Sequence, residues 1–172
     1  DASGAITEFS EGLAPGSKPL ALVERDGALW FSQAGASRIG RIDPKGAISS
    51  FPIPSPNAQP RAIALHPAGG VWFVETNSNA LGRVDAQGKI EEFPVGIDNA
   101  SLRGVTAGAD GDLWFTANFA NQIGHMKPDG EMVAVYDCPT PASGPRCIMS
   151  HSSGRLFYGA FDAAMIGEVR FV

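Results

Sequence analysis

The chain carries few positive charges and no run of them. Its 172 residues include 13 Lys and Arg against 18 Asp and Glu, which gives a formal net charge of −5 at pH 7. A nucleic-acid-binding surface requires a basic patch, so we expect no nucleic-acid partner. The uninterrupted apolar stretches are far shorter than the roughly 18 residues that a membrane-spanning helix needs, so we expect no membrane span.

Cysteine is equally scarce. Cys138 and Cys147 are the only two in the chain, and their spacing does not match the Cys-x-x-Cys motif of metal and redox sites. A disulfide between them and two free thiols are both compatible with the sequence. The chain begins at Asp1 without an initiator methionine, so we expect a processed protein or a fragment. We expect a secreted or periplasmic location.

Apolar residues at helical spacing are absent as well. With 21 Gly and 13 Pro, the composition is typical of many short strands joined by turns. A hydrophobic content of 44% is sufficient for a buried core. We predict one all-β domain over residues 1–172.

A repeat of 42 residues organises the chain. Three motifs recur at this interval, with one extra residue in the last copy. They are a glycine before a strand-like segment, a Trp-Phe pair, and an Ile-Gly or Leu-Gly pair; their members are Gly4, Gly46, Gly88 and Gly130, then Trp30, Trp72 and Trp114, then Gly40, Gly82, Gly124 and Gly167. We interpret the repeated glycines as turn positions. The repeats cover residues 4–45, 46–87, 88–129 and 130–172.

Each repeat supports four short strands. For the set of four that begins in the second repeat, we expect them at Arg61–Leu65, Val71–Glu75, Ala80–Val84 and Lys89–Phe93. Pro and Gly stand between these segments, as the hydrogen bonding of a sheet requires. Four strands in every 40 to 45 residues are the signature of a β-propeller blade, so the sequence predicts a β-propeller with four blades per chain.

The two ends of the repeat array predict how the ring closes. Residues 1–9 supply an outer strand alone, and residues 145–172 supply the first three strands of a blade. We expect the N-terminal strand to complete the last blade, which leaves no unpaired edge. A sheet spacing of about 10 Å leaves no room for side chains at the axis of a ring of four such blades. We therefore expect a homodimer in which two chains share one eight-bladed ring.

The segments Gly4-Ala-Ile-Thr-Glu-Phe9, Asp112-Leu-Trp-Phe-Thr116 and Asn121-Gln-Ile-Gly124 resemble the streptogramin B lyase (virginiamycin B lyase) family. The resemblance extends over all four repeats. It implies a propeller similar to the seven-bladed enzymes that open a cyclic depsipeptide antibiotic by elimination with Mg²⁺. It also implies catalytic histidines directly after a proline at the start of an innermost strand.

The resemblance fails at the catalytic positions. The matching places here hold Leu20, Arg61, Arg103 and Arg146, and none is histidine. The acid of the family's Trp-Phe-Thr-Glu segment is kept only at Glu75. We therefore predict no catalytic residue, metal site or cofactor. The alternatives are a Mg²⁺-dependent lyase with degenerate residues, in which Glu75 is a residual acid, and a fragment or half-ring of such an enzyme.

Three arginines suggest a binding function instead. Arg61, Arg103 and Arg146 occupy one equivalent place in successive repeats, so a ring would bring them to the mouth of its channel. Converging guanidinium groups favour an anion. We expect Leu20, as an apolar wall, and Glu75 to be further ligand-binding residues. We predict a binding or assembly module for an anionic small molecule or an acidic peptide. The alternative is that each arginine pairs with a nearby carboxylate or carbonyl and braces the ring.

The remaining polar motifs are interpreted as structural. We expect the histidines to be solvated residues of turns or strands, and the repeated aspartates to close hairpin turns through their side chains. These residues are His66, His125 and His151, then Asp43, Asp85 and Asp129.

Overall fold

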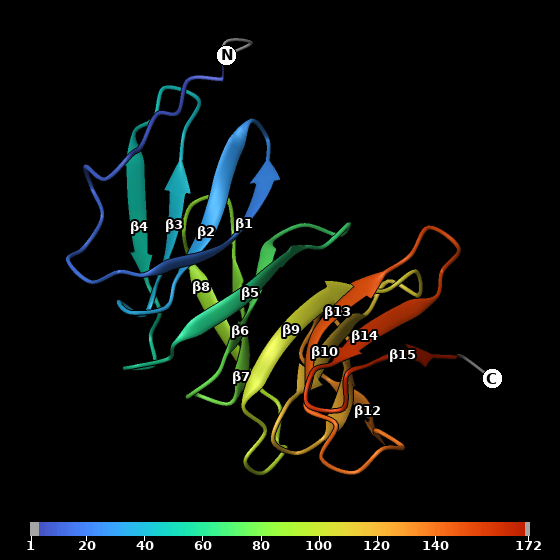
Figure 1. Ribbon diagram of the computed structural model, residues 1–172. Coiled ribbons are helices and arrows are strands. Elements are labelled where there is room, and N and C mark those ends of the chain that lie inside the picture. The colour runs from blue at the N-terminus through green and yellow to red at the C-terminus, as the bar shows by residue number, and fades with distance from the viewer. Residues whose placement is uncertain (1–3, 171–172) are drawn as a thin grey trace.

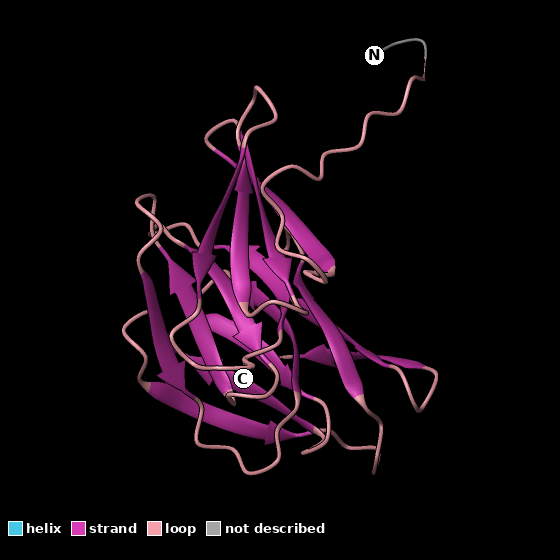
Figure 2. Ribbon diagram, turned by 90° about the vertical axis from the view of Figure 1, so that its left-hand side faces the viewer, coloured by secondary structure: helices cyan, strands magenta, loops and turns pink. Residues whose placement is uncertain are grey.

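The computed structural model describes residues 4–170, which form fifteen strands and no helix (Figure 2). The strands are β1 (Pro19–Arg25), β2 (Ala28–Gln33), β3 (Arg38–Ile42), β4 (Ile48–Pro52), β5 (Pro60–Leu65), β6 (Val71–Glu75), β7 (Ala80–Val84), β8 (Ile90–Pro94), β9 (Leu102–Ala107), β10 (Leu113–Ala117), β11 (Gln122–Met126), β12 (Met132–Asp137), β13 (Pro145–Ser150), β14 (Leu156–Ala160) and β15 (Met165–Val169). Over these residues, nothing helical is long and apolar enough to cross a membrane.

The strands form four separate antiparallel sheets. Three sheets have four strands, ordered β1–β4, β5–β8 and β9–β12, and the fourth contains β13, β14 and β15. Their first strands are neighbours in space, because β1 contacts β5, β5 contacts β9 and β9 contacts β13. Figure 1 shows the sheets fanning out around these strands, with β4 and β15 at opposite ends of an open array. The predicted all-β blade architecture is confirmed, and we call the sheets blades 1 to 4.

The core lies between neighbouring blades. Trp30 and Ile39 of blade 1 form one buried cluster with Ile63, Val71 and Phe73 of blade 2. Equivalent clusters join blade 2 to blade 3 and blade 3 to blade 4. The Trp and Phe residues of the repeat therefore pack between blades.

One set of repeated glycines does not lie in turns. Gly40, Gly82 and Gly124 are in the middle of the third strand of their blades, and an aromatic ring of the second strand lies over each one. A methyl group at Gly124 would overlap the ring of Phe115. The turn interpretation was wrong for these positions. Glycine is needed there because a larger side chain would overlap the aromatic ring, and not because the backbone has a positive φ.

The hairpin turns agree with the prediction. Asp43 Oδ1 accepts hydrogen bonds from the backbone N–H groups of Lys45 and Ala47, and Asp85 and Asp129 make similar contacts. His66, in contrast, is buried rather than solvated. Its Nδ1 accepts the N–H of Ala68, so its Nε2–H donates to the carbonyl of Gly111 in blade 3, at 3.0 Å.

Closure of the ring is not seen. Residues 4–10 form no strand, residues 1–3 lie outside the described part, and β15 has no fourth strand beside it among residues 4–170. Cys138 is buried, Cys147 is exposed, and both are free thiols, so the disulfide alternative is not realised. The dimeric ring stays a prediction.

Candidate functional site

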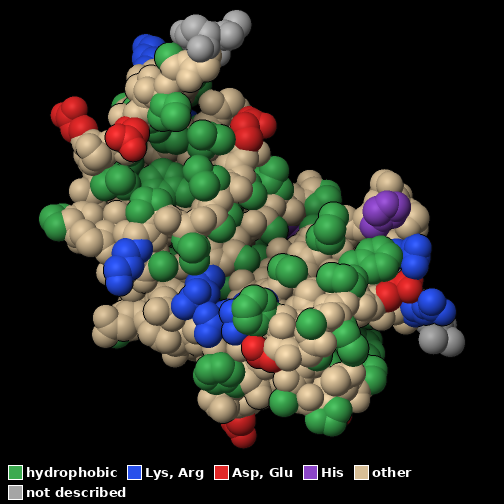
Figure 3. Space-filling model, viewed as in Figure 1, with side chains coloured by type: hydrophobic (Ala, Val, Ile, Leu, Met, Phe, Trp, Pro, Cys, Tyr) green, Lys and Arg blue, Asp and Glu red, His purple; other side chains and the backbone are tan. Residues whose placement is uncertain are grey.

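The three predicted arginines start neighbouring inner strands. Arg61, Arg103 and Arg146 are the second residues of β5, β9 and β13, and Leu20 has the same place in β1. Because these strands lie side by side, their first residues share one end of the array. Figure 3 shows Lys and Arg side chains gathered near the middle of the face seen in Figure 1. We call the surface formed by Arg61, Arg103 and Arg146 the Arg face.

The positive charges of the guanidinium groups on the Arg face repel one another. Burial lowers the pKa of Arg103, and the charges of Arg61 and Arg146 lower it further. Neither Arg61 nor Arg103 forms an ion pair with a residue of the range 4–170, and each has a buried Nε without a hydrogen-bond acceptor there. The bracing alternative requires a carboxylate or a carbonyl at each arginine, and within residues 4–170 neither Arg61 nor Arg103 has an ion pair or a hydrogen-bond acceptor at its Nε.

Arg146 differs from the other two. Its Nη2 lies 3.6 Å from Asp162 Oδ1, and its guanidinium carbon lies 3.6 Å from the centre of the Phe161 ring. Both Phe161 and Leu20 are exposed. The Arg face is therefore asymmetric, with unpaired charge at its centre and apolar side chains at its margins.

Glu75 does not belong to this surface. It ends β6 and is 0% exposed. Burial raises the pKa of its carboxyl to about 8, and the neighbouring Glu92 carboxyl acts in the same direction. At the equivalent position of blade 1, Gln33 donates its amide to Ser50 Oγ at 2.8 Å. Because its carboxyl is closed off from solvent, we remove Glu75 from the ligand-binding set.

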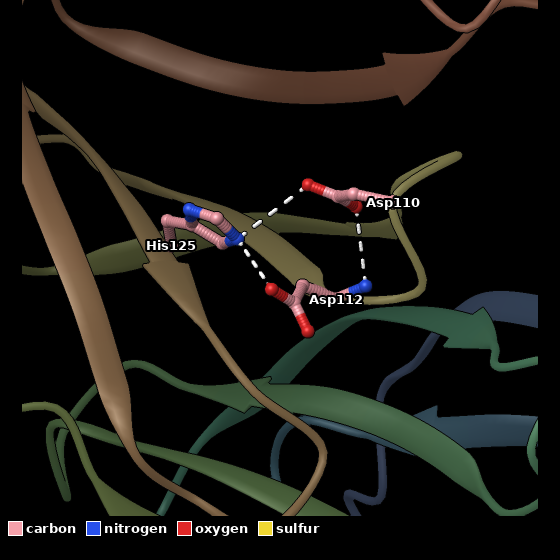
Figure 4. A group of neighbouring side chains, drawn as sticks. All are labelled: Asp110, Asp112 and His125. Atoms are coloured by element: carbon pink, nitrogen blue, oxygen red, sulfur yellow. Dashed lines mark hydrogen bonds and ion pairs between the residues drawn. The ribbon is translucent and has the colours of Figure 1, made fainter. Parts of the chain in front are cut away.

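A second polar group lies in blade 3, at the other end of β9 from Arg103. His125 of β11 directs Nε2 to Asp112 Oδ2 at 2.8 Å and to Asp110 Oδ2 at 3.5 Å (Figure 4). The imidazole ring stacks on Trp114, with ring centres 3.9 Å apart, and Trp114 Nε1 donates to Asp110 Oδ2 at 3.0 Å. His125 is buried rather than solvated, which corrects the sequence interpretation.

This group has the ligand types of a transition-metal site. One nitrogen and two carboxylate oxygens lie within 4.8 Å of one another, and imidazole and carboxylate are ligands that zinc accepts. The other blades hold Arg41, Arg83 and Glu168 in the place of His125. The sequence analysis did not predict this group. The available signal was that His125 stands where blades 1 and 2 have an arginine.

Comparison with known proteins places these observations in a family. A virginiamycin B lyase from Staphylococcus aureus superposes with a TM-score of 0.89 and 33% identity, over 99% of this chain and 61% of that one. A second streptogramin B lyase structure gives a TM-score of 0.87 and 29% identity, over 99% and 60%. The virginiamycin B lyase of Bordetella parapertussis is 53% identical over 38 residues, which are 22% of this chain and 13% of that protein.

These likenesses and the four blades define the protein as a β-propeller. The family model of the virginiamycin B lyases matches residues 1–171. The chain belongs to the virginiamycin B lyase family, and it spans 61% of the length of the solved Staphylococcus aureus enzyme.

Proposed function

We propose that the chain is a propeller binding module whose Arg face holds an anionic small molecule or an acidic peptide. The observation that carries the proposal is the absence of a carboxylate at Arg61 and Arg103 within the described residues, although their charges repel each other and that of Arg146. A multivalent anion would relieve this repulsion and would accept hydrogen bonds from the buried Nε atoms.

The expected affinity is modest. Hydrogen bonds to charged groups contribute about 1.5–3 kcal/mol each, before the costs of desolvation and ordering. Two or three such bonds support micromolar binding, and added salt weakens it by screening the charges. The exposed Leu20 and Phe161 favour a ligand that combines an acidic end with an apolar end.

Replacing Arg103 by Ala is expected to weaken binding, because Arg103 stands between the other two inner-strand arginines in the blade order. Titration calorimetry with citrate would measure the dissociation constant, and we expect an increase of at least about tenfold, equivalent to 1.4 kcal/mol. Arg25→Ala is the matched control, since Arg25 ends the inner strand β1, whereas the arginines of the Arg face begin theirs. A protein that binds neither citrate nor an amphiphilic carboxylate, with Arg103→Ala lowering only its stability, would refute the proposal.

Family membership favours a second candidate, a Mg²⁺-dependent lyase. The Arg face does not fit this ion, because Mg²⁺ binds oxygen ligands and the face presents guanidinium groups, while Glu75 is closed off from solvent. An arginine also stays protonated at neutral pH, so it cannot accept the proton that an elimination removes.

Quinupristin is the compound present in the structure of an inactive virginiamycin B lyase variant from Staphylococcus aureus. Incubation of this chain with quinupristin and Mg²⁺ is expected to leave the compound intact. Mass spectrometry and chromatography would follow it, with the Staphylococcus aureus enzyme as the positive control. Magnesium-dependent conversion by this chain would restore the lyase assignment.

A further inference from the structure

Blade 3 has a combination of polar residues that no other blade repeats. Gly108, Asp110 and Asp112 come from the turn between β9 and β10, and His125 comes from β11. The corresponding residues are Glu24, Asp26, Ala28 and Arg41 in blade 1, His66, Ala68, Gly70 and Arg83 in blade 2, and His151, Ser153, Arg155 and Glu168 in blade 4. Blade 3 packs between blades 2 and 4, so this group has the surroundings of an interior blade.

The combination places negative charge where blade 2 has a cation. Arg83 lies over the ring of Trp72 and pairs with Glu91, whereas His125 has this place over Trp114. Within residues 4–170, no Lys or Arg forms an ion pair with either aspartate of the group. The buried Nδ1 of His125 has no acceptor there, so an imidazolium would leave a buried N–H unsatisfied. Two carboxylates beside an uncharged imidazole therefore lack a compensating cation.

The ligand atoms are close to the spacing that a metal ion requires. His125 Nε2 lies 2.8 Å from Asp112 Oδ2 and 3.5 Å from Asp110 Oδ2, and it carries at most one proton to share between them (Figure 4). Zinc binds nitrogen and oxygen at about 2.0–2.2 Å, and tetrahedral geometry then separates neighbouring ligand atoms by about 3.3–3.6 Å. The longer distance fits, and the shorter one has to open by about half an ångström.

The turn holds Asp110 in position and makes room for it. Its Oδ2 accepts the Nε1–H of Trp114 at 3.0 Å, and its Oδ1 accepts the backbone N–H of Asp112 at 3.1 Å. A Cβ at Gly108 would overlap Oδ1 of Asp110, so the carboxylate can lie here because blade 3 lacks a side chain at this position. Asp110 is exposed and His125 is buried, so an ion can enter from solvent past Asp110.

We propose that Asp110, Asp112 and His125 bind one divalent transition-metal ion, for which zinc is the best match. Three protein ligands leave the fourth position of a tetrahedral site to water. Mg²⁺ and Ca²⁺ take oxygen ligands, so the imidazole nitrogen disfavours them. The site lies at the other end of β9 from Arg103 and is independent of the Arg face. The sequence analysis predicts no metal site, and the proposal departs from it.

The expected affinity is moderate, and the expected role is structural. Coordination through Nε2 of His125 leaves the proton on Nδ1, which has no acceptor among the described residues. A metal-binding histidine usually donates this N–H, and loss of such a partner costs about 10–100-fold in affinity. We therefore expect micromolar binding. The bound ion would link the turn between β9 and β10 to β11 and so stabilise blade 3.

Titration calorimetry with zinc chloride, on protein first freed of metal with a chelator, tests the site. All proteins carry Cys147→Ser, because the exposed thiol is itself a zinc ligand. We expect one ion per chain. His125→Arg restores the residue that blades 1 and 2 have at this position, so it should fold, and it is expected to raise the dissociation constant at least about tenfold. Asp112→Asn, which keeps the size of the side chain, should act in the same direction. His151→Gln is the matched control, since His151 is an exposed histidine of the equivalent turn in blade 4, and it should leave the affinity unchanged.

Two further measurements complete the test. Zinc should raise the melting temperature of the Cys147→Ser protein and leave that of its His125→Arg variant unchanged, because an ion that binds the folded state alone stabilises it. Anomalous scattering from crystals grown with zinc should place the ion between Nε2 of His125 and the two carboxylates. Absence of saturable binding would overturn the proposal. So would equal affinity in His125→Arg, or an ion bound at another place in the chain.

Discussion

Replacing Glu75 by Gln is expected to stabilise the protein by roughly 3 kcal/mol at pH 7. Glu75 is fully buried at the end of β6, and burial together with Glu92 raises the pKa of its carboxyl from 4.5 to about 8. An amide avoids the proton uptake that folding imposes on this carboxyl at neutral pH. Blade 1 already has an amide at the equivalent position, where Gln33 donates a hydrogen bond to Ser50.

The pH dependence of stability follows from the same group. Between pH 4.5 and about 8 the carboxyl of Glu75 is protonated in the folded protein and ionised in the unfolded chain. The unfolded state then binds fewer protons, so the free energy of unfolding decreases as pH rises through this window. The contribution of Glu75 is complete below pH 4.5 and is lost as pH approaches 8. Glu75→Gln is expected to remove this slope.

Urea denaturation at several pH values between 5 and 8 would measure the effect. Glu11→Gln is the control, because Glu11 is an exposed carboxyl and its replacement should leave the slope unchanged. Glu92→Gln should reduce the slope, since Glu92 contributes to the raised pKa of Glu75. An unchanged pH dependence in Glu75→Gln would show that this carboxyl is ionised in the folded protein.

The sequence was sufficient for the blades because their signals are local. Of the four expected strands, two coincide with β6 and β7, the first begins one residue after β5, and the last is shifted by one residue from β8. The agreement is close because Pro and Gly mark the turns, and Trp72 and Phe73 mark the core. The common position of the inner-strand arginines was likewise readable from the repeat. Their pairing was not, because it depends on where Asp162 lies after folding.

The missed features depend on contacts across strands. Glu75 and Glu92 are 17 residues apart, and only the alignment of β6, β7 and β8 brings them together. His125 meets Asp112 in the same way, across the pairing of β10 with β11. The burial of individual side chains also could not be predicted from the sequence. A carboxylate at the end of a strand is expected to be exposed, and whether it is buried depends on the neighbouring strand that packs over it.

Replacing Gly124 by Ala is expected to destabilise the protein by about 3 kcal/mol, as overpacking of a filled core does. Gly124 lies in β11 opposite Phe115, and an added methyl group would overlap the aromatic ring. The ring is fully buried within the interface between blades 2 and 3. It therefore cannot move aside without disturbing the residues around it. Gly124 is outside the left-handed region, so the cost is steric and does not come from the backbone.

A double mutant separates this cause from a general loss of stability. Gly124→Ala combined with Phe115→Leu should be less destabilised than the sum of the two single variants, because the smaller side chain makes room for the methyl group. Gly111→Ala is the comparison for backbone strain, since Gly111 has φ +85 and nothing within 4 Å of the added carbon. That variant should lose only about 1 kcal/mol. Additive effects in the double mutant, measured by urea denaturation, would mean that the ring does not require the glycine. The Ile-Gly and Leu-Gly pairs of the repeat would then need another explanation.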